Sequence, residues 1–86
     1  MADLEIPDRL VKLKQRFWAA DATCQAVADE PETTDEQARQ DQAGRLAAAR
    51  RERSELVMEI HRDSWWTEVP NRYEADKALN AKAREA

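Results

Sequence analysis

The sequence predicts an all-α fold, a long antiparallel helical hairpin followed by a shorter third helix, in one small domain over residues 1–86. Alanine is abundant, there is one glycine, and the three prolines fall where helices should begin or end. Two long stretches also repeat apolar residues at alternating steps of four and three, as in a coiled coil. A short linker between them requires the second helix to run back along the first.

The first helix is expected over residues 7–28. Pro7 suits a first turn, because its missing N–H would have no partner there in any case. The helix should end before Pro31, since the residue preceding a proline is pushed out of the α region. One apolar seam runs along this helix and should face the second helix. Its positions are Ile6, Leu10, Leu13, Phe17, Ala20, Cys24 and Val27.

The second helix is expected over residues 35–62. Thr33 with Glu36, or Thr34 with Gln37, could form a capping box at its start. Its seam is weaker than that of the first helix, because it includes a glutamine and an arginine. The seam positions are Gln42, Leu46, Ala49, Arg53, Leu56 and Ile60.

The two seams align if Ile6 lies opposite Ile60, which also sets large residues against small ones. This register puts Arg53 opposite Leu13, and a charge at a seam position is costly unless it is paired. Arg53 could extend to solvent, pair with a carboxylate such as Asp21 of a neighbouring molecule, or fix the register of an assembly. The other expected pairs are Leu10 with Leu56, Phe17 with Ala49, Ala20 with Leu46, and Cys24 with Gln42.

The third helix is expected over residues 70–83, with Pro70 near its start and Asn71 with Glu74 as a capping box. The joint before it contains Trp65 and Trp66. One indole should plug the open end of the hairpin, and the other could anchor a partner, because tryptophan is enriched in binding hot spots. The alternative is that both indoles are structural plugs.

Leu4, Val11 and Trp18 recur every seven residues, about 130° around the first helix from its seam. The second helix cannot bury them as well as the seam. Three partners could bury these side chains. They are the tryptophan joint with the third helix, a second copy of the chain that completes a dimeric four-helix bundle, or a different protein. The candidate partner-binding residues are therefore Leu4, Val11, Trp18, Trp65 and Trp66.

Arg45, Arg50 and Arg51 are the candidate nucleic-acid contacts, because they lie in the most basic part of the chain. Two observations make nucleic acid the less favoured partner. The net charge is −4, and these arginines do not share one helix face. The competing interpretation is a solvated face of mixed charge, with Arg51 and Glu55 as an i,i+4 ion pair.

The sequence predicts no catalytic, cofactor-binding or metal-ligating residues. His61 is the one histidine and Cys24 the one cysteine, and the hairpin places them at opposite ends. A single glycine cannot form a glycine-rich phosphate loop. We find no run of about 18 apolar residues and no basic segment followed by an apolar one at the N-terminus. Neither a membrane-spanning helix nor a signal peptide is therefore expected.

The predicted function is therefore a small, acidic, non-enzymatic and cytoplasmic helical protein that acts in protein–protein interaction or assembly. Because the large aliphatic residues are sparse, the core should be thin, and self-association as a homodimer is expected. The first alternative is a nucleic-acid-associated accessory protein. The second is a small helical enzyme whose site forms between subunits of an oligomer.

Overall fold

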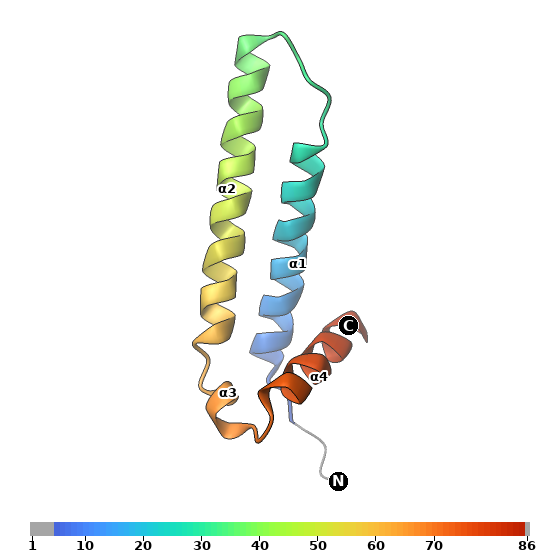
Figure 1. Cartoon of the computed structure of the whole chain (residues 1–86), viewed down its shortest axis with the longest axis vertical. Helices are drawn as coiled ribbons and strands as arrows, with labels where there is room; N and C mark the ends of the chain where they lie inside the picture. Colours follow the sequence, from blue (N-terminus) through green and yellow to red (C-terminus); the bar gives the residue numbers. More distant parts are fainter. Residues whose placement is uncertain (1–4, 86) are drawn as a thin grey trace.

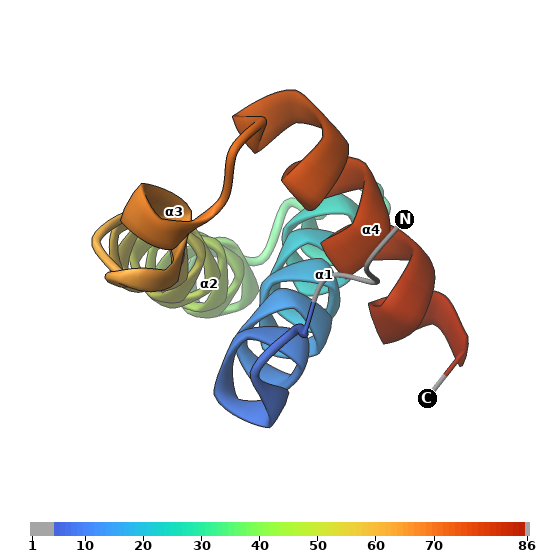
Figure 2. The same cartoon turned by 90° about the horizontal axis from the view of Figure 1, so that it is seen from below.

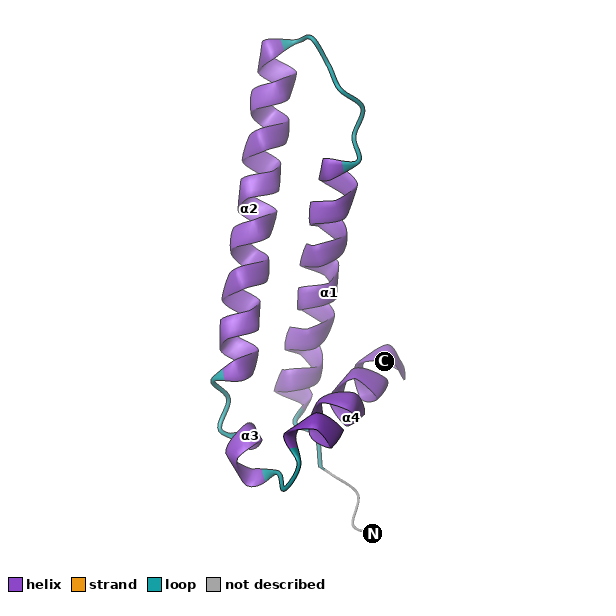
Figure 3. Cartoon of the chain, in the orientation of Figure 1, coloured by secondary structure: helices purple, strands orange, loops and turns teal. Residues whose placement is uncertain are grey.

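The computed structural model describes residues 5–85, and within that range it consists of helices and loops (Figures 1 and 3). Two long helices lie side by side and antiparallel, and a short helix leads into a fourth that packs on the first. The predicted all-α hairpin with a shorter helix after it is confirmed. The helices are α1 (Asp8–Ala28), α2 (Glu36–His61), α3 (Trp65–Glu68) and α4 (Arg72–Glu85).

The start of α2 differs from the capping boxes expected at Thr33 and Thr34. Asp35 is the N-cap, and its carboxylate accepts hydrogen bonds from the backbone N–H groups of Gln37 and Ala38. The Thr33 hydroxyl accepts instead from the Asp35 N–H. A carboxylate satisfies these donors and also interacts favourably with the positive end of the helix dipole. Asp35 therefore takes the position for which two threonines were expected.

One contact between the two long helices departs from the expected pairing by about three residues. Gln42, expected opposite Cys24, donates its side-chain N–H to the carbonyl of Val27 at 2.9 Å. Residues 29–35 rise past the end of α1, so that the first turns of α2 extend beyond it (Figure 1). A linker with Pro31 in it is too extended to return the chain in a tight turn.

The core lies at the end of the hairpin away from this loop, where α3 and α4 meet the two long helices. Leu10 of α1 and Leu79 of α4 are fully buried there. Seen along the hairpin, α4 lies against α1 on the side away from α2 (Figure 2). The buried residues of this cluster are Leu10, Val11, Ile60, Trp65, Trp66, Ala75, Leu79 and Ala83.

The loop end of the hairpin is a thinner structure made of two helices. Its buried residues on α1 are the small or medium side chains of Ala20, Cys24 and Val27. On α2, the first buried residue from the N-terminus is Ala49. The molecule measures 58 × 23 × 18 Å, as expected if much of the hairpin has solvent on both sides. Within residues 5–85, no helix has the length and apolar character needed to span a bilayer.

Candidate interaction surface

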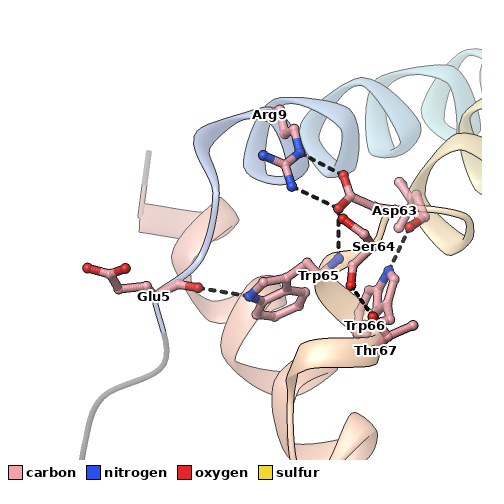
Figure 4. Close-up of polar contacts among 8 residues, drawn as sticks. Glu5, Arg9, Asp63, Ser64, Trp65, Trp66 and Thr67 are labelled. Atoms are coloured by element: carbon pink, nitrogen blue, oxygen red, sulfur yellow. Dashed lines mark hydrogen bonds and ion pairs between the residues drawn. The ribbon is translucent and has the colours of Figure 1, made fainter.

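The two tryptophans of the joint close the packed end of the hairpin (Figure 4). The Trp65 indole N–H donates to the carbonyl of Glu5 at 2.9 Å, and the Trp66 indole N–H donates to the carbonyl of Ile60 at 2.6 Å. Their rings meet edge to face with centroids 4.9 Å apart, and the residues are 5% and 8% exposed. Both indoles are therefore part of the core of the single chain, and neither ring is exposed for contact with a partner.

Asp63 holds the joint against α1. Its carboxylate accepts two hydrogen bonds from the Arg9 guanidinium, at 2.7 and 2.9 Å, and a third from the Trp65 backbone N–H at 3.0 Å (Figure 4). The Arg9 hydrogen bonds, with help from the Trp65 N–H, lower the pKa of Asp63 from 3.8 to about 2. The ionised carboxylate is thus bound more strongly in the folded chain than in the unfolded one.

This pair should make stability depend on pH in the acid range. A depressed pKa stabilises the fold above the unfolded value of 3.8, and that contribution is lost as the pH falls toward about 2. The variant Asp63→Asn should therefore be less stable than the wild type at pH 6, and the difference should shrink by pH 2. Urea unfolding followed by circular dichroism measures the free energy of unfolding at each pH. Arg9→Gln should show the same dependence on pH. A difference that is the same at pH 2 and pH 6 would contradict this role.

The stripe expected from Leu4, Val11 and Trp18 is covered by the chain itself where the structure describes it. Val11 is buried in the core, and Trp18 is half-buried against that core beneath the guanidinium of Arg84, 5.6 Å from its ring centroid. The last turn of α4 is tied to α1 by the Gln15 side chain, which donates to the carbonyl of Ala83. Leu4 lies outside the described residues. These contacts support the first of the three alternatives, in which the chain's own C-terminal helix buries the stripe.

The arginines of α2 divide into paired and unpaired ones. Arg45 donates two hydrogen bonds to Glu30 at 2.6 and 2.8 Å, which raises the pKa of Arg45 and lowers that of Glu30. Arg50 and Arg51 are exposed, and within residues 5–85 neither lies within 4.0 Å of a carboxylate oxygen. The expected ion pair between Arg51 and Glu55 is therefore not formed.

Arg53 lies in an ion pair at the edge of a hollow between α1 and α2. Its guanidinium pairs with Asp21 of the same chain at 2.8 Å, where the sequence left solvent, a neighbouring molecule's Asp21 and a register role open. Beside this pair is a hollow of about 430 Å³, which we call the hairpin groove. Phe17 and Val57 are half-buried there, and Met58 is 63% exposed. The residues that line the hairpin groove are Phe17, Asp21, Arg53, Ser54, Val57 and Met58.

A second hollow of about 370 Å³ lies where α1, the end of α2 and the start of α4 meet, and we call it the basic hollow. It adjoins the hairpin groove, because the Lys14 ammonium in its wall lies 5.4 Å from the centroid of the Phe17 ring. Tyr73 on its rim is 70% exposed. The residues that line the basic hollow are Lys14, His61, Trp66, Arg72, Tyr73 and Asp76.

Sequence reasoning did not single out Val57, Met58 and Arg72, nor Tyr73 as an exposed residue. A signal for the first two was present. They follow Leu56 directly, and one helix face cannot bury three consecutive apolar residues. The sequence pattern could not have identified Arg72, because its place beside Trp66 depends on how α4 packs. Within the described residues, no group of three histidine, cysteine, aspartate or glutamate side chains is placed to hold a metal ion.

Comparison with known proteins gives one result. A family model described as a domain of unknown function, DUF8825, matches residues 9–82. The chain belongs to this family. The match begins at Arg9, the partner of Asp63, and ends at Lys82 in α4, so the DUF8825 domain contains the hairpin, the tryptophan joint and most of α4. Comparisons with curated proteins and with solved structures gave no match.

Proposed function

We propose that this DUF8825 protein is a small non-enzymatic helical interaction protein that self-associates through the hairpin groove. The observation that carries the proposal is the exposed apolar surface formed by Met58 with Phe17 and Val57. It lies along a hairpin whose loop end has two helices and small buried side chains. A second pair of helices would bury that surface and enlarge a thin core. The proposal includes a cytoplasmic location, which the single free cysteine favours.

A second copy of the chain fits the charges around the groove. In a dimer with two-fold symmetry, the same patch meets itself, so each charge on it needs an opposite charge on the same patch. The hairpin groove supplies both signs, since Asp21 and Arg53 lie side by side at its edge. Turning one groove against another can set each carboxylate near the other chain's guanidinium while the methionines and phenylalanines meet. Two hairpins packed in this way form a four-helix bundle.

The variant Met58→Glu tests this interface. Because Met58 is 63% exposed, a glutamate there should leave the single chain folded, but it would bring a charge into the apolar centre of the dimer. We expect the wild type to sediment as a dimer at high micromolar concentration, and the variant to have a dissociation constant at least about tenfold higher. Sedimentation velocity measures the association, and circular dichroism checks the helix content.

Ala48→Glu is the matched control, because it adds the same charge at an exposed position of α2 that does not line the groove. It should associate as the wild type does. A wild type that is monomeric at these concentrations would overturn the proposal. So would Met58→Glu associating as tightly as Ala48→Glu, because the interface would then lie elsewhere on the molecule.

The nucleic-acid alternative has narrower support. Arg50 and Arg51 are exposed and without a carboxylate partner among the described residues, so they are available to phosphates. Arg45, the third candidate, is already paired with Glu30. Because the chain as a whole has a net charge of −4, two arginines give it a weak attraction for a polyanion. Self-association is therefore the function that the geometry supports best.

A further inference from the structure

We propose that the basic hollow binds a small oxyanion, a carboxylate or a phosphate group, between Arg72 and Lys14. The two cations come from different helices, because Arg72 is the first residue of α4 and Lys14 lies in the N-terminal third of α1. Both line the same hollow of about 370 Å³. Pockets of this size can hold a small molecule. The basic hollow adjoins the hairpin groove but shares no lining residue with it, so variants can test the two proposals independently.

Arg72 is held in place before any ligand arrives. Its guanidinium lies over the ring of Trp66, 5.1 Å from the centroid, and it donates one N–H to His61 Nδ1 at 2.9 Å. His61 in turn stacks on Trp66, with ring centroids 6.4 Å apart and ring planes 20° apart. Trp66 is itself fixed in the core. A guanidinium has five N–H donors, so this arrangement orients Arg72 and leaves donors for a planar or tetrahedral oxyanion.

The charge around the hollow is not balanced by the protein. Within residues 5–85, neither Arg72 nor Lys14 lies within 4.0 Å of a carboxylate oxygen. Asp76 is the single acidic residue in the lining, against two permanent cations. Arg72 is also the first residue of α4, where the positive end of the helix dipole favours negative charge.

Two further hollows each contain one cation with no carboxylate oxygen within 4.0 Å among residues 5–85, Lys82 in one and Arg39 in the other. Arg53, in the hairpin groove, is paired with Asp21. Arg9, in a larger hollow of about 680 Å³ beside Trp65, is paired with Asp63, and Glu5 and Glu68 add further negative charge there. The basic hollow differs from these hollows because it contains two cations without a carboxylate partner, Lys14 and Arg72, beside the ring of Trp66.

Nuclear magnetic resonance titration of the full chain tests the site, with sodium phosphate and sodium acetate as separate probes at constant ionic strength. We expect the indole N–H resonance of Trp66 to shift in a saturable way with at least one probe, while that of Trp18 stays in place. Arg72→Gln should weaken this binding at least about tenfold, because it removes a charge-assisted contact. Lys14→Gln should weaken it in the same direction.

Lys77→Gln is the control, because it removes one positive charge from the same helix at a residue that does not line the hollow. It should bind as the wild type does, and so should Met58→Glu, whatever its effect on association. Saturation by phosphate alone assigns the site to phosphate, and saturation by both probes assigns it to oxyanions in general. The proposal is overturned if neither probe gives saturable shifts, if sodium chloride gives the same shifts, or if folded Arg72→Gln and Lys14→Gln bind as tightly as Lys77→Gln.

Discussion

Replacing Trp66 with alanine is expected to destabilise the protein by about 3–5 kcal/mol, the usual cost of removing a large buried aromatic side chain. Trp66 is 8% exposed, packs edge to face on Trp65, and donates its indole N–H to the carbonyl of Ile60 at 2.6 Å. The alanine variant loses this packing and also the indole hydrogen bond to the Ile60 carbonyl, which keeps a longer bond from the Asp63 backbone N–H. Because an 86-residue chain is only marginally stable, much of the population should unfold.

Urea unfolding followed by far-ultraviolet circular dichroism measures this loss. Trp66→Phe separates the two contributions, because it keeps an aromatic ring in the core while removing the N–H donor, and it should fall between the wild type and the alanine variant. Tyr73→Ala is the control on a nearby exposed ring and should change stability by less than about 1 kcal/mol. If Trp66→Ala were as stable as Tyr73→Ala, the joint would not be part of the core.

Leu79→Ala is expected to lower the free energy of unfolding by roughly 2–5 kcal/mol, since Leu79 is fully buried and its removal leaves a cavity between α4 and α1. A helix of 14 residues is marginal in water on its own, so α4 depends on this packing. The variant should therefore lose protection of the α4 amides before that of the α1 and α2 amides. Hydrogen exchange measured by nuclear magnetic resonance resolves these helices.

Leu46→Ala provides the comparison for that experiment. It removes the same atoms from a half-buried leucine near the loop end of α2, where the space around the side chain is partly filled by solvent. Leu46→Ala should lower the free energy of unfolding by clearly less than Leu79→Ala does. Equal losses for the two variants would show that the loop end contributes as much to the core as the packed end, contrary to the burial of their side chains.

The hairpin was predictable because its determinants are local. Periodic apolar residues, alanine in helix interiors and prolines at the breaks set the helices through interactions between near neighbours in the chain. The register was not predictable in the same way. A heptad seam repeats, so a shift of one turn exchanges one acceptable set of contacts for another. The bond from Gln42 to Val27 is one contact that departs from the expected pairing.

The candidate surfaces were harder to predict for the same reason. Val11 and Trp18 were predicted to need a cover other than α2, and the sequence left three possible covers open. The choice of α4 depends on contacts between residues about 70 positions apart, such as Gln15 with Ala83. The environment of Arg53 was also left open. In the folded chain it pairs with Asp21 at the edge of the hairpin groove.

The sequence by itself determined that this protein is helical, where its long helices begin and end to within a residue or two, and that one face of α1 needed a second cover. Tertiary structure alone decided the pairing of α1 with α2, the burial of both tryptophans, and the meeting of Lys14 with Arg72 at one hollow. Helix formation depends on residues a few positions apart, whereas these features depend on residues tens of positions apart. Such contacts are fixed only when the whole core is packed at once.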